Sequence, residues 1–169
     1  MKASYLKILI TTLAFTLPLT VNAEDEHHQT QASENTALAL PADIKPLLTK
    51  EMQQIQLGMM NLLPAISSGQ WDKIAEIAKE MQGSYIMKQQ LTKEQMQTLH
   101  KTLPPAFIGL DQNFHRLAGM LAHVAEERKS ELVNFYFYKL TESCGQCHSQ
   151  YAQQRFPAFA EQGNKEHHH

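Results

Sequence analysis

Apolar side chains recur every three or four residues through most of this sequence, which is the repeat of an α-helix and not of a β-strand. Between residues 48 and 66 the steps are 4, 3, 4, 3 and 4, at Leu48, Met52, Ile55, Met59, Leu62 and Ile66. Such a stripe covers one face of a helix, which must be buried against a neighbour. The sequence has no convincing run of alternating apolar residues and no hairpin turn signal. We therefore expect an all-α fold.

The spacing predicts four long helices. The first starts near residue 43, and Pro64 is expected to kink it or to end it. The second spans about residues 71–89. Its inward residues are expected to be Ile74, Ile77, Ala78, Met81 and Tyr85. The third starts at Pro104-Pro105, because proline suits the first turn of a helix. Its inward residues are Ile108, Leu110 or Asp111, Phe114, Leu117, Leu121 and Val124.

The fourth long helix is bounded by Pro157. Its inward face carries Val133, Phe137, Leu140, Cys144, Cys147 and Tyr151. Thr92 and Gln95 form a capping-box pattern, which predicts a short helical piece before the third long helix. Four amphipathic helices with short connections favour an antiparallel four-helix bundle over residues 41–157.

The first 23 residues are typical of a secretory signal peptide. Lys2 and Lys7 precede an apolar stretch of about a dozen residues, and Val21-Asn22-Ala23 matches the small-x-small cleavage pattern. A transmembrane anchor is the alternative, but it needs about 20 apolar residues. We expect cleavage after Ala23 and export to the periplasm, with no membrane span in the mature chain.

Both ends of the mature chain are polar. Residues 24–40 are low in complexity and are expected to form a flexible leader, and residues 158–169 form a polar tail. His167–His169 are either a native end or a purification tag. The whole chain has 15 basic and 17 acidic residues. Without a basic excess to neutralise phosphates, nucleic acid is not an expected partner.

The last predicted helix contains Cys144-Gly145-Gln146-Cys147-His148, which is the C-x-x-C-H pattern of covalent haem attachment. Positions i, i+3 and i+4 share one face of a helix. Two thiols can therefore bond to the two vinyl groups of one haem, while the histidine supplies the proximal iron ligand.

Other uses of the two cysteines fit less well. A disulfide oxidoreductase places C-x-x-C at the start of a helix in a strand-containing fold, and no strands are expected here. A disulfide within one helical turn would be awkward. A zinc site would need more ligands at suitable spacing than two cysteines supply. We therefore expect one covalent haem c.

Because the C-x-x-C-H motif lies in the last of several predicted helices, the sequence resembles the cytochrome c′ and cytochrome c556 family. Three stretches carry the resemblance: Pro64-Ala65-Ile66-Ser67-Ser68-Gly69, Gly69-Gln70-Trp71-Asp72, and Cys144 through Tyr151. The resemblance covers about residues 43–156. It implies a bundle with haem bound at Cys144 and Cys147 near the C-terminal helix, and His148 as the proximal ligand. The family usually has a basic residue directly after the tyrosine, whereas this chain has Ala152, with Arg155 one turn later.

The resemblance also implies that the second axial position of the iron decides the function. A methionine from the first helix makes the haem six-coordinate and low-spin in c556-like members, and Met52 is the expected ligand here. The alternatives are Met59, a histidine such as His115 or His123, or an apolar, open site as in cytochromes c′. Another alternative is that Met52 is an ordinary core residue with no role in binding iron, because methionine often fills irregular gaps in protein cores. Phe114, His115 and Tyr151 are expected to line the haem pocket.

We expect a periplasmic electron carrier that exchanges single electrons with redox partner proteins. The alternative is a five-coordinate haem protein that binds or sequesters nitric oxide or carbon monoxide. An enzyme such as a peroxidase is not expected, because no paired catalytic residues are visible. Family members often pair through their first two helices, so a homodimer is a further possibility. Phe135-Tyr136-Phe137-Tyr138 cannot all face inward on one helix.

Overall fold

The computed structural model describes residues 38–160, and these residues form helices and no strand. The predicted signal peptide (residues 1–23), most of the predicted leader (residues 24–40) and residues 161–169 lie outside the described residues. Six helices are assigned: α1 (Lys45–Ser67), α2 (Trp71–Gly83), α3 (Met87–Gln90), α4 (Lys93–Thr102), α5 (Pro105–Glu126) and α6 (Ser130–Tyr151). The all-α prediction is confirmed.

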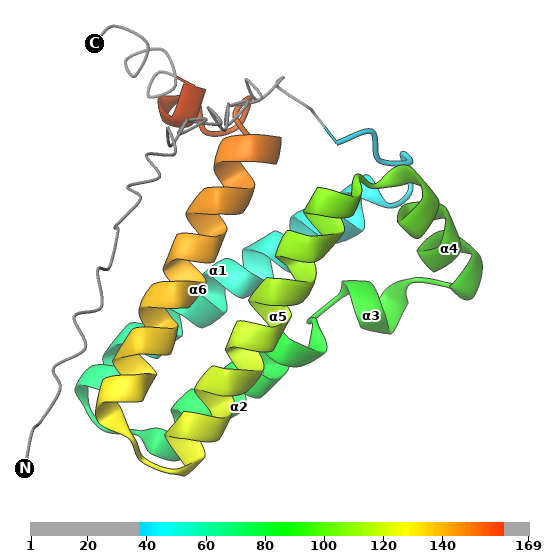
Figure 1. The fold of residues 1–169 in the computed structure, drawn as a ribbon. Helices are drawn as coiled ribbons and strands as arrows, with labels where there is room; N and C mark the ends of the chain where they lie inside the picture. Colours follow the sequence, from blue (N-terminus) through cyan, green and yellow to red (C-terminus); the bar gives the residue numbers. More distant parts are fainter. Residues whose placement is uncertain (1–37, 161–169) are drawn as a thin grey trace, which may run out of the picture. The chain divides into compact units, whose positions relative to one another are not determined.

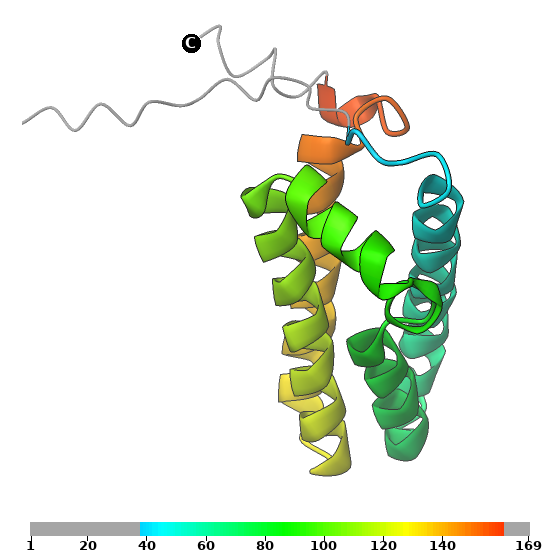
Figure 2. The same cartoon turned by 90° about the vertical axis from the view of Figure 1, so that its right-hand side faces the viewer.

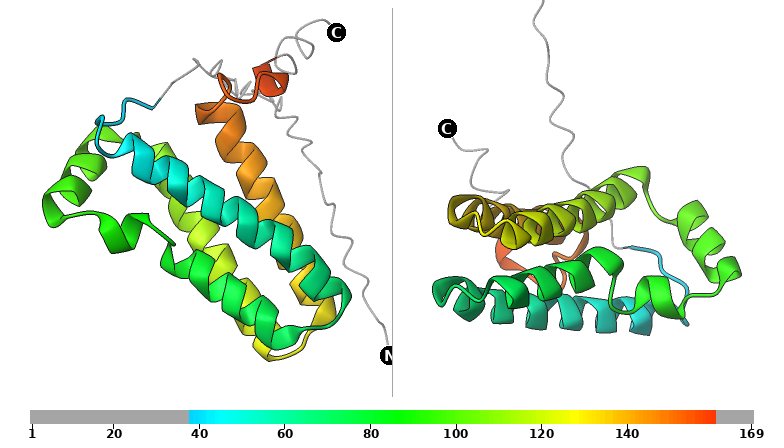
Figure 3. Two further views of the ribbon diagram at one scale, coloured as in Figure 1. Left: turned by 180° about the vertical axis from the view of Figure 1, so that it is seen from behind. Right: turned by 90° about the horizontal axis from the view of Figure 1, so that it is seen from below.

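The four long helices lie in two pairs, α1 with α2 and α5 with α6 (Figures 1 and 3). Consecutive long helices run in opposite directions (Figure 1). The most extensive packing is between α2 and α5, followed by α5 with α6, whereas α1 packs mainly on α2. The short helix α4 crosses between the two pairs at one end (Figure 2).

The buried core lies between α1, α2, α5 and α6. It includes Leu62, Ile74, Met81, Leu121 and Leu140, all with no measurable exposure. The predicted inward residues of α2 are buried, except that Tyr85 is only half-buried. In the aromatic run, Tyr136 and Phe137 pack against the core, while Phe135 and Tyr138 are exposed.

Several predicted boundaries differ from the structure. Pro64 does not end α1, which continues for three residues to Ser67. The expected second helix to residue 89 is wrong, because α2 ends at Gly83 and a separate turn forms α3. Ser84 has a φ of 61°, which a right-handed helix does not allow. The Thr92–Gln95 capping box is confirmed, with both of its hydrogen bonds formed.

Within residues 38–160, none of the helices combines the length and the apolar character that crossing a bilayer requires.

The close approach of α1 to α2 depends on Gly58. A Cβ atom at this position would lie 2.5 Å from Cε of Met81 and 2.7 Å from the hydroxyl oxygen of Tyr85. Met81 is fully buried, so its side chain has no free volume to move into. Gly109, on an exposed part of α5, has nothing within 4 Å of the equivalent position.

We therefore predict that Gly58→Ala lowers the free energy of unfolding by about 1–3 kcal/mol, because extra volume in a packed core forces side chains to shift. Gly109→Ala is the matched control and should raise it by up to about 1 kcal/mol through helix propensity. Urea unfolding followed by circular dichroism measures both. Equal effects of the two substitutions would contradict close packing at Gly58.

Candidate functional site

The C-x-x-C-H motif occupies the last two turns of α6. Cys144 and Cys147 are both free thiols, and both are half-buried. Cys144 packs against the helix core. Because they are three residues apart on a continuous helix, the two side chains lie on one face, as attachment to a single flat group requires.

The two thiols are held in the neutral form. Burial raises the pKa of the Cys144 thiol. The pKa of Cys147 is raised to about 11, first by burial and then by the negative charge of Asp111. Since the thiolate is the nucleophilic form, these cysteines are poor nucleophiles at neutral pH.

His148 is the next residue of the motif, and its imidazole lies parallel to the ring of Phe156. The ring centres are 4.4 Å apart and the planes differ by 16°. Burial, and then the positive charge of Arg155, lower the pKa of His148. The imidazole is therefore neutral at physiological pH, which is the form that binds metal ions.

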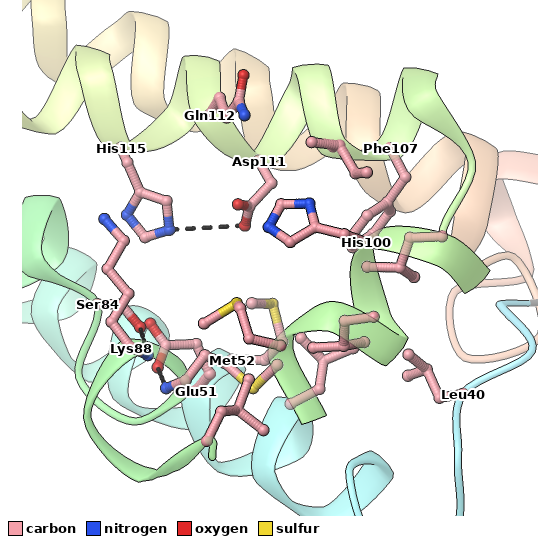
Figure 4. Close-up of a pocket in the computed structure, with 17 residues that line it drawn as sticks. Leu40, Glu51, Met52, Ser84, Lys88, His100, Phe107, Asp111, Gln112 and His115 are labelled. Atoms are coloured by element: carbon pink, nitrogen blue, oxygen red, sulfur yellow. Dashed lines mark hydrogen bonds and ion pairs between the residues drawn. The ribbon is translucent and has the colours of Figure 1, made fainter. Parts of the chain in front are cut away.

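A cavity of about 240 Å³ lies between the start of α1, the helices α3 and α4, and the start of α5 (Figure 4). Most of its wall is apolar. Met52 and Glu51 lie on one side, and His100, Asp111 and His115 on the other (Figure 4). Met87 and Met96 also line it, so that three thioether sulfur atoms share one cavity.

His115 is a polar residue of the cavity wall whose two ring nitrogens both have partners. Its Nδ1 lies 2.6 Å from the carbonyl oxygen of Met81, and its Nε2 lies 3.5 Å from Oδ1 of Asp111. Burial is the largest single influence on this group and would lower its pKa, but the hydrogen bond and charge of Asp111 and the Met81 carbonyl outweigh it. The pKa of His115 is therefore raised, so that the proton is retained beside Asp111.

Two features relate the cavity to the end of α6 that carries the motif, although Cys144, Cys147 and His148 do not line the cavity. Asp111 lines the cavity, and its charge acts on the thiol of Cys147. Phe107 also lines the cavity, and its ring meets that of Tyr151 edge-on, with centres 5.2 Å apart. One face of α5 therefore contacts both the cavity and the C-terminal end of α6.

The predicted site residues are distributed around this region. Met52 and His115 line the cavity, and Met52 is 40% exposed. Phe114 is buried in the helix core, with its ring edge-on to His115. The ring of Tyr151 contacts Phe107, and Phe107 lines the cavity. Met59 packs against the core.

His123 lies in the last turn of α5, where its exposed ring faces Glu127, and it does not line the cavity.

Sequence reasoning missed Glu51 and His100, and it considered Asp111 only as a member of an apolar face. Glu51 is four residues before Ile55, in the register of the buried stripe of α1. A charged residue at a core position is unusual and was the available signal. Nothing in the local sequence around His100 indicates that it lines a cavity.

The residue types present are those that a covalent haem would use. A haem macrocycle supplies most of the iron ligands itself, so the protein needs only two thiols and one or two further ligands. Cys144 and Cys147 offer the thiols, His148 an imidazole and Met52 a thioether sulfur. The first three of these residues do not line the cavity that contains Met52. Among residues 38–160, no three His, Cys, Asp or Glu side chains converge to hold a metal.

No family model matches this sequence, and no curated protein or solved structure was found to be similar to it. The motif and the geometry around it are therefore the features of this chain that point to a function.

We predict slow alkylation of both cysteines in the folded chain before any cofactor is attached. At pH 8 the raised pKa of Cys147, about 11, leaves roughly 100-fold less thiolate than an ordinary thiol has. Iodoacetamide labelling followed by mass spectrometry should accelerate as the pH rises toward 11. The same chain unfolded in urea is the control, and its labelling rate should rise around the pKa of an ordinary thiol. Equally fast labelling of the folded and unfolded chains at pH 8 would contradict this environment.

Proposed function

We propose that this chain is a monohaem c-type cytochrome that transfers single electrons, with the four-helix bundle of the cytochrome c556 and c′ family. The observation that carries the proposal is the C-x-x-C-H motif on one face of α6. Tyr151, three residues after the motif, lies against Phe107 in the wall of a cavity that Met52 also lines.

Each motif residue has one role in this proposal. Cys144 and Cys147 would form the two thioether bonds, each by addition of its S–H across one vinyl group of the haem. His148 would bind the iron through its neutral imidazole, while stacking on Phe156 limits rotation of the ring. The bound haem would supply one-electron chemistry.

Met52 is the proposed second axial ligand. It projects into the cavity from α1, on the side opposite Asp111 and His115 (Figure 4). A thioether ligand stabilises the reduced iron and raises the reduction potential. The apolar wall of the cavity excludes water and acts in the same direction.

The alternative is a cytochrome c′-type protein that binds nitric oxide or carbon monoxide. The apolar lining favours it, because Leu48, Leu91, Leu99 and Ile108 surround space large enough for a small gas. In that case Met52 would not bind iron and would only line the cavity.

We further propose that the protein is exported to the periplasm and exchanges electrons there with other proteins. The signal-peptide pattern of residues 1–23 supports export. Leu57, Met60 and Leu63 are exposed on α1, which has no charged residue after Glu51, and they support pairing with a second copy. The proposed role is that of a carrier and not of an enzyme.

We predict that the exported protein carries one haem that survives acid-acetone extraction, because thioether bonds are covalent. Intact-mass spectrometry should give residues 24–169 plus one haem. Cys144→Ala combined with Cys147→Ala should release all of the haem, while Ser149→Ala, on the exposed side of α6, should retain it. An exported protein without bound haem would overturn the proposed function.

We predict a low-spin ferric spectrum with the charge-transfer band of a methionine–iron bond. Met52→Ala should abolish this band, produce a high-spin spectrum and allow carbon monoxide to bind the reduced iron. Met60→Ala is the matched control, because Met60 is exposed outside the cavity on the same helix. A high-spin wild-type protein that binds carbon monoxide would instead select the cytochrome c′ alternative.

A further inference from the structure

The segment from Ser84 to Leu103, which contains α3 and α4, forms one wall of the cavity. Figure 2 shows α4 crossing from the start of α5 toward the α1 and α2 pair. The residues of this segment that line the cavity are Ser84, Met87, Lys88, Leu91, Met96, Leu99, His100 and Leu103. Nearly half of the lining residues therefore come from a part of the chain that the core does not contain.

This segment is only lightly attached to the long helices. Its two helices contribute a single buried residue, Leu99. The capping box of Thr92 and Gln95 stabilises α4 locally and does not fix it to its surroundings. On α4, the side-chain hydrogen bond to a distant residue is that from Nε2 of Gln95 to Oδ2 of Asp43, which is exposed.

The other end of the segment is held by a buried carboxylate. Glu51 is only 2% exposed, and it accepts backbone hydrogen bonds from three consecutive residues of the chain. Oε1 accepts from the N–H of Tyr85 at 3.1 Å. Oε2 accepts from the N–H groups of Ile86 at 2.6 Å and Met87 at 3.1 Å. These are charge-assisted bonds to donors at the start of α3, which would otherwise be unpaired.

The helical backbone of α2 is interrupted directly before these three donors. Ser84 is buried with a φ of 61°, and its hydroxyl accepts the N–H of Lys88 at 3.2 Å. Glu51 also immediately precedes Met52 on α1. One side chain therefore connects the turn of α1 that carries Met52 to the start of the segment that closes the cavity.

We propose that Glu51 is a positioning residue that holds residues 84–103 as a cover over the cavity, and that loosening this clamp opens the cavity to small molecules. The cover turns about Ser84, where the clamp lies, and separates at the weakly attached α4. The clamp itself rests on the geometry of Glu51. The expectation that a gas or another iron ligand enters the cavity depends on the proposed function.

Glu51→Gln tests the clamp without changing side-chain size. A glutamine offers one acceptor oxygen and one NH₂ group, and the NH₂ group would face backbone N–H donors. At least one of the three hydrogen bonds is then lost. Losing a hydrogen bond to a charged group should increase the equilibrium constant for opening of the segment by about 10- to 100-fold. Glu80→Gln is the matched control, because Glu80 is exposed on α2 and the charge change is the same.

The first measurement is amide hydrogen exchange and trypsin cleavage of the full exported protein. In Glu51→Gln, the amides of Tyr85, Ile86 and Met87 should exchange about 10- to 100-fold faster, and cleavage after Lys88 and Lys93 should accelerate similarly. Glu80→Gln should match the wild type. Unchanged exchange in Glu51→Gln, or an equal loss of protection at Leu121 in the core, would overturn the proposal.

The second measurement is the rate at which carbon monoxide binds the reduced holoprotein in a Met52→Ala background. Adding Glu51→Gln should raise this rate severalfold, whereas adding Glu80→Gln should leave it unchanged. A role of Glu51 in folding alone would not alter the rate, and an unaltered rate contradicts a cover. If the exported protein lacks haem, the proposed function fails, while the exchange measurement still decides whether Glu51 holds the segment.

Discussion

Helix α5 packs against α2 on one side and α6 on the other, and most of the fold depends on this double contact. Ala118, Ala122 and Ala125 are almost completely buried along it. Small side chains let three helices approach closely and bury their larger apolar neighbours, which is the main stabilising contribution to a core of this kind. The direction of α6, and with it the position of its C-terminal end, follows from packing on α5.

The same helix changes character along its length. Its C-terminal half carries the buried alanines, while its N-terminal half presents Phe107, Asp111 and His115 to the cavity. The core is therefore closed at one end and open at the other. The open end coincides with the last turns of α6, because α5 and α6 run in opposite directions (Figure 1). The motif and the cavity therefore lie at the same end of α5, for reasons of packing that involve neither cysteine.

Sequence patterns within a single helical turn predicted the helix ends that depend on that turn alone. Pro104-Pro105 marks the start of α5 and Thr92 caps α4, because each depends on hydrogen bonds or dihedral angles within one turn. The end of α2 could not be predicted in this way. The amides that follow it, of Tyr85, Ile86 and Met87, donate to the carboxylate of Glu51, which lies more than thirty residues earlier in the chain.

Part of the candidate site could likewise be predicted. The spacing of Cys144, Cys147 and His148 defines one helix face without knowledge of any neighbour. Met52 and His115 were expected near the site from the family resemblance, and Met52 also from its place in the apolar stripe of the first helix; both line the cavity. His100 was missed, because α4 reaches the cavity only through the path of the whole segment between α2 and α5.

The sequence by itself determined the helical class, the shared helix face of Cys144, Cys147 and His148 and the local caps, because each depends on residues within a few positions of one another. Only the tertiary structure decided that Asp111 and Phe107 line one cavity with Met52, that α3 and α4 form a wall of it, and that a buried glutamate binds the amides at the start of α3. These features join residues far apart in the chain, so no local pattern indicates them.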